Sequence, residues 1–257
     1  LRYTKDERDF KGSTALPNAT VNGNPVPGGI TIPQTAPDSE SDKKPTWRIA
    51  LDHKFTSDTL GYISYNRGFK SGVYNMINPN GQPVSSEKVD AYELGWKTEM
   101  LQRRLRLNSS AFYYDYNDLQ VQTINQGSVV LFNAPKAKIM GAEVEMQALP
   151  TEHLEVNANL ALLDSEYTDF PNADITTPNP APAGGNASVK GSVKGNEVAR
   201  APSFTAALGG RYGIPVSSGE VGISGAITYN GGFYWEPDNR SEQDAYAIVN
   251  AQIDWRS

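Results

Sequence analysis

The feature of this 257-residue sequence that most constrains its fold is a period-two alternation of apolar and polar residues. Within 47–55, the apolar positions Trp47, Ile49 and Leu51 alternate with Arg48, Ala50 and Asp52. Successive side chains of a strand point to opposite faces, so this pattern predicts strands with one apolar and one polar face. The alternation recurs at 92–97, 142–148, 154–162, 204–212, 221–229 and 247–255, and more weakly at 1–10, 60–67 and 105–116. Together these segments predict about ten long strands.

The connections between these segments alternate strictly in length. Long connections rich in Pro, Gly, Asn and Ser lie at 11–44, 71–87, 117–136, 165–199 and 233–243. Short ones lie between them, at 56–58, 101–103, 150–153 and 215–218. This rhythm predicts an antiparallel up-and-down sheet with one elaborate end and one plain end, which is the asymmetry of outer-membrane β-barrels. We therefore expect all the long connections on one rim and all the short turns on the other.

Composition excludes several classes of protein. No apolar run approaches the roughly 18–20 residues of a spanning helix, and the longest are Val129–Phe132 and Leu160–Leu163. A helical membrane protein is excluded, whereas a transmembrane barrel is not, because only every second residue of its strands faces lipid. The net charge of -6 argues against a nucleic-acid partner. The absence of cysteine removes a disulfide framework and a thiolate metal site.

The polar face of the predicted strands carries too many charges to fill a dry core. These residues can line a wide, wet lumen instead, and they are Arg48, Asp52, Glu93, Lys97, Glu143, Glu145, Glu155 and Arg211. We expect the three glutamates from 93 to 145 to form ladders with Lys97 and Arg48. The inverse arrangement, a soluble barrel or sandwich with its apolar face buried, stays possible from the pattern. Strand length and loop rhythm favour the membrane version, with Ile49, Leu51, Tyr92, Leu94, Val144, Leu160 and Ile223 exposed on a convex outer surface.

Five stretches carry a resemblance to a known family. They are LRYTKDER at 1–8, YNRGFKSG at 65–72, EKVDAYELGWK at 87–97, FYYDYNDLQVQ at 112–122, and Asn133-Ala134 followed by IMGAEVE at 139–145. In this order they resemble the barrel of TonB-dependent receptors, the outer-membrane importers of siderophores, vitamins and glycans. Each stretch is weak alone, but the five in register cover nearly the whole chain.

The resemblance implies an all-β fold, an antiparallel up-and-down transmembrane β-barrel of 22 strands, of which residues 1–257 hold about ten. It implies that the plug domain, the first barrel strands and the last strands lie outside this sequence. It also implies a location in the bacterial outer membrane, in contact with its lipid. The implied function is binding of a scarce substrate, most often an iron–siderophore complex, with cobalamin and glycan as alternatives. Import to the periplasm would use the TonB–ExbB–ExbD complex, acting through the plug, and would involve no bond chemistry.

The sharpest cluster of candidate site residues lies at 65–70. Tyr65, Arg67, Phe69 and Lys70 are candidates for contact with an anionic substrate or with the plug at the outer lumen. The alternative interpretation is a strand-end bend in which Arg67 pairs with a neighbouring carboxylate.

No catalytic, cofactor-binding or metal-binding residues are expected. There is no nucleophile–base–orienter set, and His53 and His153 have no second His or Cys at ligand spacing. We therefore do not expect an enzyme. The alternative functions are a soluble or cell-surface β-sandwich that acts as a binding or adhesin domain, and a passive porin.

Overall fold

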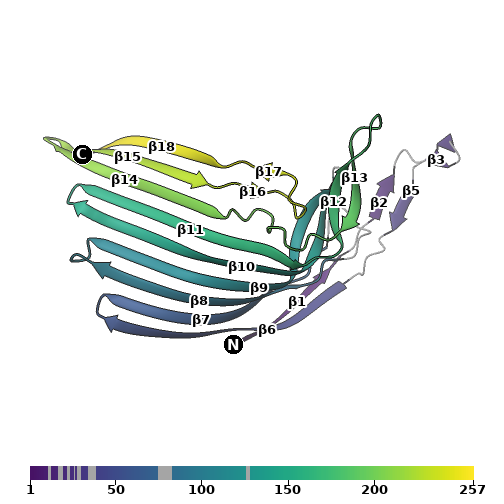
Figure 1. The fold of residues 1–257 in the computed structure, drawn as a ribbon, viewed down its shortest axis with the longest axis horizontal. Coiled ribbons are helices and arrows are strands. Elements are labelled where there is room, and N and C mark those ends of the chain that lie inside the picture. Colours follow the sequence, from purple (N-terminus) through teal and green to yellow (C-terminus); the bar gives the residue numbers. More distant parts are fainter. Residues whose placement is uncertain are drawn as a thin grey trace.

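Ten strands form one antiparallel sheet, and nearly all are joined to their neighbours along the chain (Figure 1). The structure, a computed structural model, describes residues 1–10, 13–16, 20–21, 24–25, 27, 30–33, 39–74, 83–125 and 128–257. The sheet order is β1 (Arg2–Asp9), β6 (Ser39–Thr56), β7 (Thr59–Lys70), β8 (Glu87–Met100), β9 (Leu105–Asn125), β10 (Ser128–Thr151), β11 (Leu154–Asp169), β14 (Phe204–Val216), β15 (Gly219–Asn230) and β18 (Tyr246–Arg256). The predicted meander of about ten strands is confirmed.

The remaining strands form four small hairpins within the long connections. They are β2 (Ser13–Leu16) with β5 (Ile30–Pro33), β3 (Thr20–Val21) with β4 (Asn24–Pro25), β12 (Ala173–Pro178) with β13 (Asn186–Gly191), and β16 (Phe233–Tyr234) with β17 (Glu242–Gln243). All regular elements in the described part of the chain are strands. That part contains no helix long and apolar enough to cross a membrane.

The short turns and the long connections lie at opposite ends of the sheet. In Figure 1 the turns gather at the left, and the connections that carry β2–β5 and β12–β13 project at the right. An antiparallel meander produces this separation, because each strand reverses the direction of the one before it. The predicted arrangement of the two rims is confirmed where the structure describes it. Parts of three predicted connections lie outside the described residues, namely 11–12, 17–19, 22–23, 26, 28–29, 34–38, 75–82 and 126–127.

Three predicted connections are shorter than expected because the strands run further. Most of 117–136 belongs to β9 and β10, which pair as far as Asn125 opposite Ser128. Asp118 adopts a positive φ of 56° and interrupts the alternation there, as an irregularity in a strand does. Residues 39–44 belong to β6 and pair with β1, but their polar sequence shows no apolar alternation. β11 likewise continues to Asp169.

Buried apolar residues gather at the loop end of the sheet rather than beneath its centre. They are Ala134, Ala137, Tyr167, Phe170, Ala173, Val193 and Val198. Over the rest of the described sheet, large apolar side chains on one face remain exposed. The sheet is therefore a wall, with a packed apolar cluster only where the long connections fold over it.

Gly141, in the middle of the wall, leaves no room for a side chain. A Cβ on Gly141 would lie 2.4 Å from the Leu162 carbonyl oxygen and 2.7 Å from the Phe112 ring. The backbone oxygen belongs to the paired strand β11 and cannot move without breaking the ladder. A Cβ on Gly225, by contrast, would meet its nearest atom, the Asn250 carbonyl oxygen, at an ordinary 3.7 Å.

Replacing Gly141 with Ala should therefore lower the free energy of unfolding by about 1–3 kcal/mol, the usual cost of overpacking. The matched Gly225→Ala should be neutral or stabilising by up to about 1 kcal/mol, because Ala loses less chain entropy than Gly in a strand. Urea unfolding of the full receptor in lipid vesicles, followed by tryptophan fluorescence, measures both changes. Equal effects of the two substitutions would contradict the packing described for Gly141.

Candidate functional site

The register of the strands joins their apolar positions into one continuous face. Leu51 lies opposite Ile63, Ile63 opposite Leu94, and Leu94 opposite Ala111. The same face continues across β10, β11 and β14 to Ile223 of β15 and Ile253 of β18. The seven residues expected on the outer surface are 37% (Val144) to 71% (Leu51) exposed. No second sheet covers this face within the described residues, so these side chains are not packed as they would be in a sandwich.

The opposite face is polar and concave. A hollow of 520 Å³ spans seven strands, from Tyr62 of β7 to Thr228 of β15. The hollow on the apolar face spans only the four strands β6 to β9, so the broader hollow indicates that the sheet curves towards its polar face. Its polar lining includes Glu93, Lys97, Asn108, Ser110, Glu143, Glu145, Asn159 and Thr205. The prediction that charged residues line a wet lumen is confirmed for Glu93, Lys97, Glu143 and Glu145.

The glutamates of this hollow do not form the predicted ladders with Lys97 and Arg48. Lys97 lies opposite Asn108, and Asn108 lies opposite Glu145, so an amide on β9 separates the two charges. Asn108 donates to Glu145 instead, at 3.1 Å. Glu93 accepts from the Tyr62 hydroxyl, whose ring lies over Gly95. Glu143 has no hydrogen-bond or ion-pair partner among the described residues, so its carboxylate is available to whatever fills the lumen.

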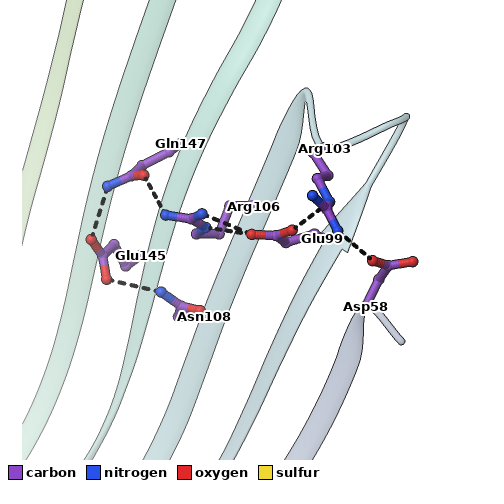
Figure 2. Close-up of polar contacts among 7 residues, drawn as sticks. All are labelled: Asp58, Glu99, Arg103, Arg106, Asn108, Glu145 and Gln147. Atoms are coloured by element: carbon purple, nitrogen blue, oxygen red, sulfur yellow. Dashed lines mark hydrogen bonds and ion pairs between the residues drawn. The ribbon is translucent and has the colours of Figure 1, made fainter. Parts of the chain in front are cut away.

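A second polar network lines the concave face near the short turns (Figure 2). Arg106 donates to Glu99 at 2.7 and 3.1 Å and reaches Gln147 at 3.5 Å. Arg103, in the β8–β9 turn, lies 3.4 Å from the other oxygen of Glu99 and 4.0 Å from Asp58. These contacts join the β6–β7 turn to β10 along the rim. Sequence reasoning missed this network because its members come from different strands and turns.

The four candidate residues at 65–70 do not converge on one spot. By alternation Tyr65, Arg67 and Phe69 share the outer face with Ile63, whereas Lys70 lies on the concave side. Arg67 donates to both oxygens of Asp90, at 2.5 and 2.7 Å, and the Tyr65 hydroxyl donates to Asp90 at 2.8 Å. The predicted pairing of Arg67 with a carboxylate is confirmed. The placement at the lumen is wrong for Tyr65, Arg67 and Phe69, and contact with a substrate stays a prediction.

The Arg67–Asp90 pair belongs to a row of charges that limits the apolar face. Through successive strand pairs the row runs from Arg67 and Asp90 to Asp115, Lys138 and Glu166. The row directly below it on the turn side contains Tyr65, Tyr92 and Tyr113, with the first two rings stacked at 4.9 Å. A tyrosine row beside charges is typical of a membrane–water boundary. From Ala91 to Met100, β8 then has the roughly 9–11 residues that a tilted strand needs to cross a bilayer.

The described residues hold no group of three or more His, Cys, Asp or Glu side chains that could bind a metal ion.

The sequence model described as "TonB dependent receptor-like, beta-barrel" matches residues 1–257. The chain belongs to this family. Among curated relatives, the ferrichrome outer membrane transporter/phage receptor of Escherichia coli (strain K12) is 24% identical over 220 residues, which are 84% of this chain and 26% of that protein. The pesticin receptor of Yersinia enterocolitica is 24% identical over 222 residues, which are 84% of this chain and 30% of that protein.

Solved structures share the fold. The ferric yersiniabactin uptake receptor FyuA from Yersinia pestis has a TM-score of 0.69 and 23% identity, covering 98% of this chain and 34% of that one. The siderophore receptor PiuA from Acinetobacter baumannii has a TM-score of 0.65 and 19% identity, covering 98% and 32%. The chain thus spans about a quarter to a third of the length of these relatives. It forms part of an outer-membrane β-barrel.

Adjacent positions on β11 test the assignment of the two faces. Leu160 lies on the apolar face and Asn159 on the concave face, and both are exposed. Leu160→Arg should lower the free energy of unfolding in lipid vesicles by about 2–4 kcal/mol, because arginine is costly near the bilayer midplane. Asn159→Arg should change it by less than about 1 kcal/mol. Equal costs of the two substitutions, or the reverse order, would show that the faces are wrongly assigned.

The Arg67–Asp90 pair provides a separate test of the outer boundary. Asp90→Ala should lower the free energy of unfolding by about 1.5–3 kcal/mol, since it removes charge-assisted hydrogen bonds from a largely buried carboxylate. The control is Arg103→Ala, which breaks ion pairs of an arginine that is 76% exposed and should cost less than about 1 kcal/mol. Urea unfolding of each variant gives the comparison. The boundary role is refuted if the Asp90 substitution is no more costly than the control.

Proposed function

We propose that the protein is an outer-membrane receptor that binds an iron–siderophore complex and imports it to the periplasm. The observation that carries the proposal is the combination of an exposed apolar outer face with a wet, charged concave face in a chain of this family. The names of its relatives support the choice of substrate. They include a ferrichrome transporter, a ferric yersiniabactin uptake receptor and a siderophore receptor.

In this proposal the long connections and the concave face of the sheet have separate roles. The long connections face the outside of the cell and bind the substrate, since loops on a rigid scaffold can vary without disturbing it. The concave face surrounds a plug, to which Glu143 and the polar groups of the hollow are open. Of the four candidate contact residues, Lys70 is the one that we propose contacts a substrate in the lumen, because it lies on the concave side at the loop end. Energy would come from the TonB–ExbB–ExbD complex acting on the plug.

The second candidate is a passive porin, which the same two faces would also suit. The two functions differ in their need for energy. Binding and uptake by a receptor are separate steps, and only uptake requires the inner-membrane complex, whereas a porin conducts its solute without it.

The test uses the full-length receptor in a strain that lacks its own siderophore receptors. Radioactive iron supplied as a panel of ferric siderophores should accumulate in cells that express the receptor. Accumulation should stop after deletion of TonB, while binding at the cell surface persists. Uptake that continues without TonB would favour the porin. The proposal fails if no iron chelate is bound or imported.

A further inference from the structure

Two of the long connections are joined into one body at the loop end. The segment 193–200 lies between the end of β11 and the segment 233–239. On one side, the Tyr167 amide donates to the Asn196 carbonyl oxygen at 2.9 Å, and the Gly195 amide donates to the Tyr167 carbonyl oxygen at 2.8 Å. On the other side, the Glu197 amide donates to the Asn239 side chain at 2.8 Å, and the Asn196 side chain donates to the Pro237 carbonyl oxygen at 3.0 Å.

This body lies over the concave side of the wall. By alternation Tyr167 shares the inner face with Ser165 and Leu163, and its buried ring packs in the apolar cluster with Phe170, at 5.4 Å between centroids. The Ala199 amide donates to the Tyr167 hydroxyl at 3.3 Å. The segment that leads to Arg200 therefore packs on the inner side of the wall at its loop end, the side along which an imported molecule would pass.

Arg200 is held in this body by its backbone. Its φ is 62°, a left-handed conformation that costs a residue with a Cβ about 1–2 kcal/mol. The Arg200 amide donates to the Tyr234 carbonyl oxygen at 2.7 Å, which ties it to the strand that carries Phe233. Strained backbone of this kind persists only where its surroundings fix it, and it occurs often at functional sites.

The Arg200 side chain joins an aromatic ring to an amide. Its guanidinium carbon lies 5.5 Å from the centroid of the Trp235 ring, and Phe233 packs edge-on against Trp235 at 4.9 Å. With the Gln122 amide oriented so that its oxygen faces Arg200, that oxygen accepts from Nη2 at 2.8 Å and from Nη1 at 3.2 Å. A guanidinium has five N–H donors, so three are left without a partner among the described residues.

Two properties of this cluster are not explained by its role in tying the connections together. Trp235 is 40% exposed, and Arg200 is exposed as well. Arg200 forms no ion pair with any described residue. A cation with a fixed backbone beside a partly exposed indole ring suits a ligand that has both an aromatic ring and anionic oxygens, because the ring stacks and the oxygens accept charge-assisted hydrogen bonds.

We infer that Arg200, Trp235 and Gln122 form a subsite for the aryl, anionic part of an iron chelate. The inference rests on the proposed function and narrows its substrate to catecholate or phenolate complexes. A hydroxamate has no ring to stack on Trp235, and a citrate complex has the charge without the ring.

The experiment measures binding of three probes to the full-length receptor in detergent by fluorescence quenching. The probes are an iron(III) tris-catecholate, an iron(III) trihydroxamate and iron(III) citrate. Arg200→Gln removes a charge-assisted contact and Trp235→Leu removes the stacking ring, and each should weaken tris-catecholate binding about tenfold. Trp235→Phe should restore part of that loss. The control Arg240→Gln removes an exposed cation of the same connection and should change binding less than about twofold.

The outcomes separate this inference from the proposed function. Selective loss of tris-catecholate binding, with an unchanged pattern of limited proteolysis, supports the subsite. An equal loss for the tris-catecholate and for another probe that binds would make Arg200 a structural tie only and would overturn the inference. Binding and TonB-dependent uptake of the trihydroxamate alone would also overturn it, while leaving the proposed function intact. If no chelate binds the wild-type receptor, both proposals fail.

Discussion

The constraint on which the structure depends is that backbone N–H and C=O groups in a lipid layer must find partners within the protein. The ladder meets this demand from β7 to β15, because each of these strands pairs along most of its length with the strands on both sides. Long strands and short turns follow from it, since a turn within the apolar band would leave backbone groups unpaired. Gly141 shows how closely the paired backbones approach one another.

Pairing of the backbone also determines which side chains become neighbours. Because the register is continuous, apolar positions of nine strands merge into one outer face, and the rows of Tyr and charged residues at its edge line up across β7, β8 and β9. The alternate side chains of each strand point to the concave face. Its charges are separated by amides and hydroxyls, as with Asn108 between Lys97 and Glu145. A wall built this way presents lipid-compatible and water-compatible surfaces without any dry core beneath its centre.

The sequence was sufficient to predict the strands whose alternation is unbroken, such as 154–162 in β11 and 92–97 in β8. It could not predict where alternation stops without the strand stopping, as at Asp118, or where a polar run such as 39–44 pairs as a strand. Register between strands was also out of reach, so the partner of Glu145 was missed. The outward direction of Arg67 follows from its alternation with Ile63, and it was missed because a charged residue was expected to face the lumen. The cluster of Arg200, Gln122 and Trp235 unites residues from two connections and strand β9, and no local pattern in the sequence brings them together.

The hydrogen bonds between the segments 193–200 and 233–239 have a consequence for how such a receptor can change its specificity. Each connection supplies the support on which the other rests, through pairs such as Glu197 with Asn239 and Arg200 with Tyr234. An insertion in one of them would displace the other, so the two cannot diversify separately. A chimaera that exchanges a single connection with a relative would inherit mismatched halves, whereas exchange of both together, with the end of β11, would transfer a complete unit.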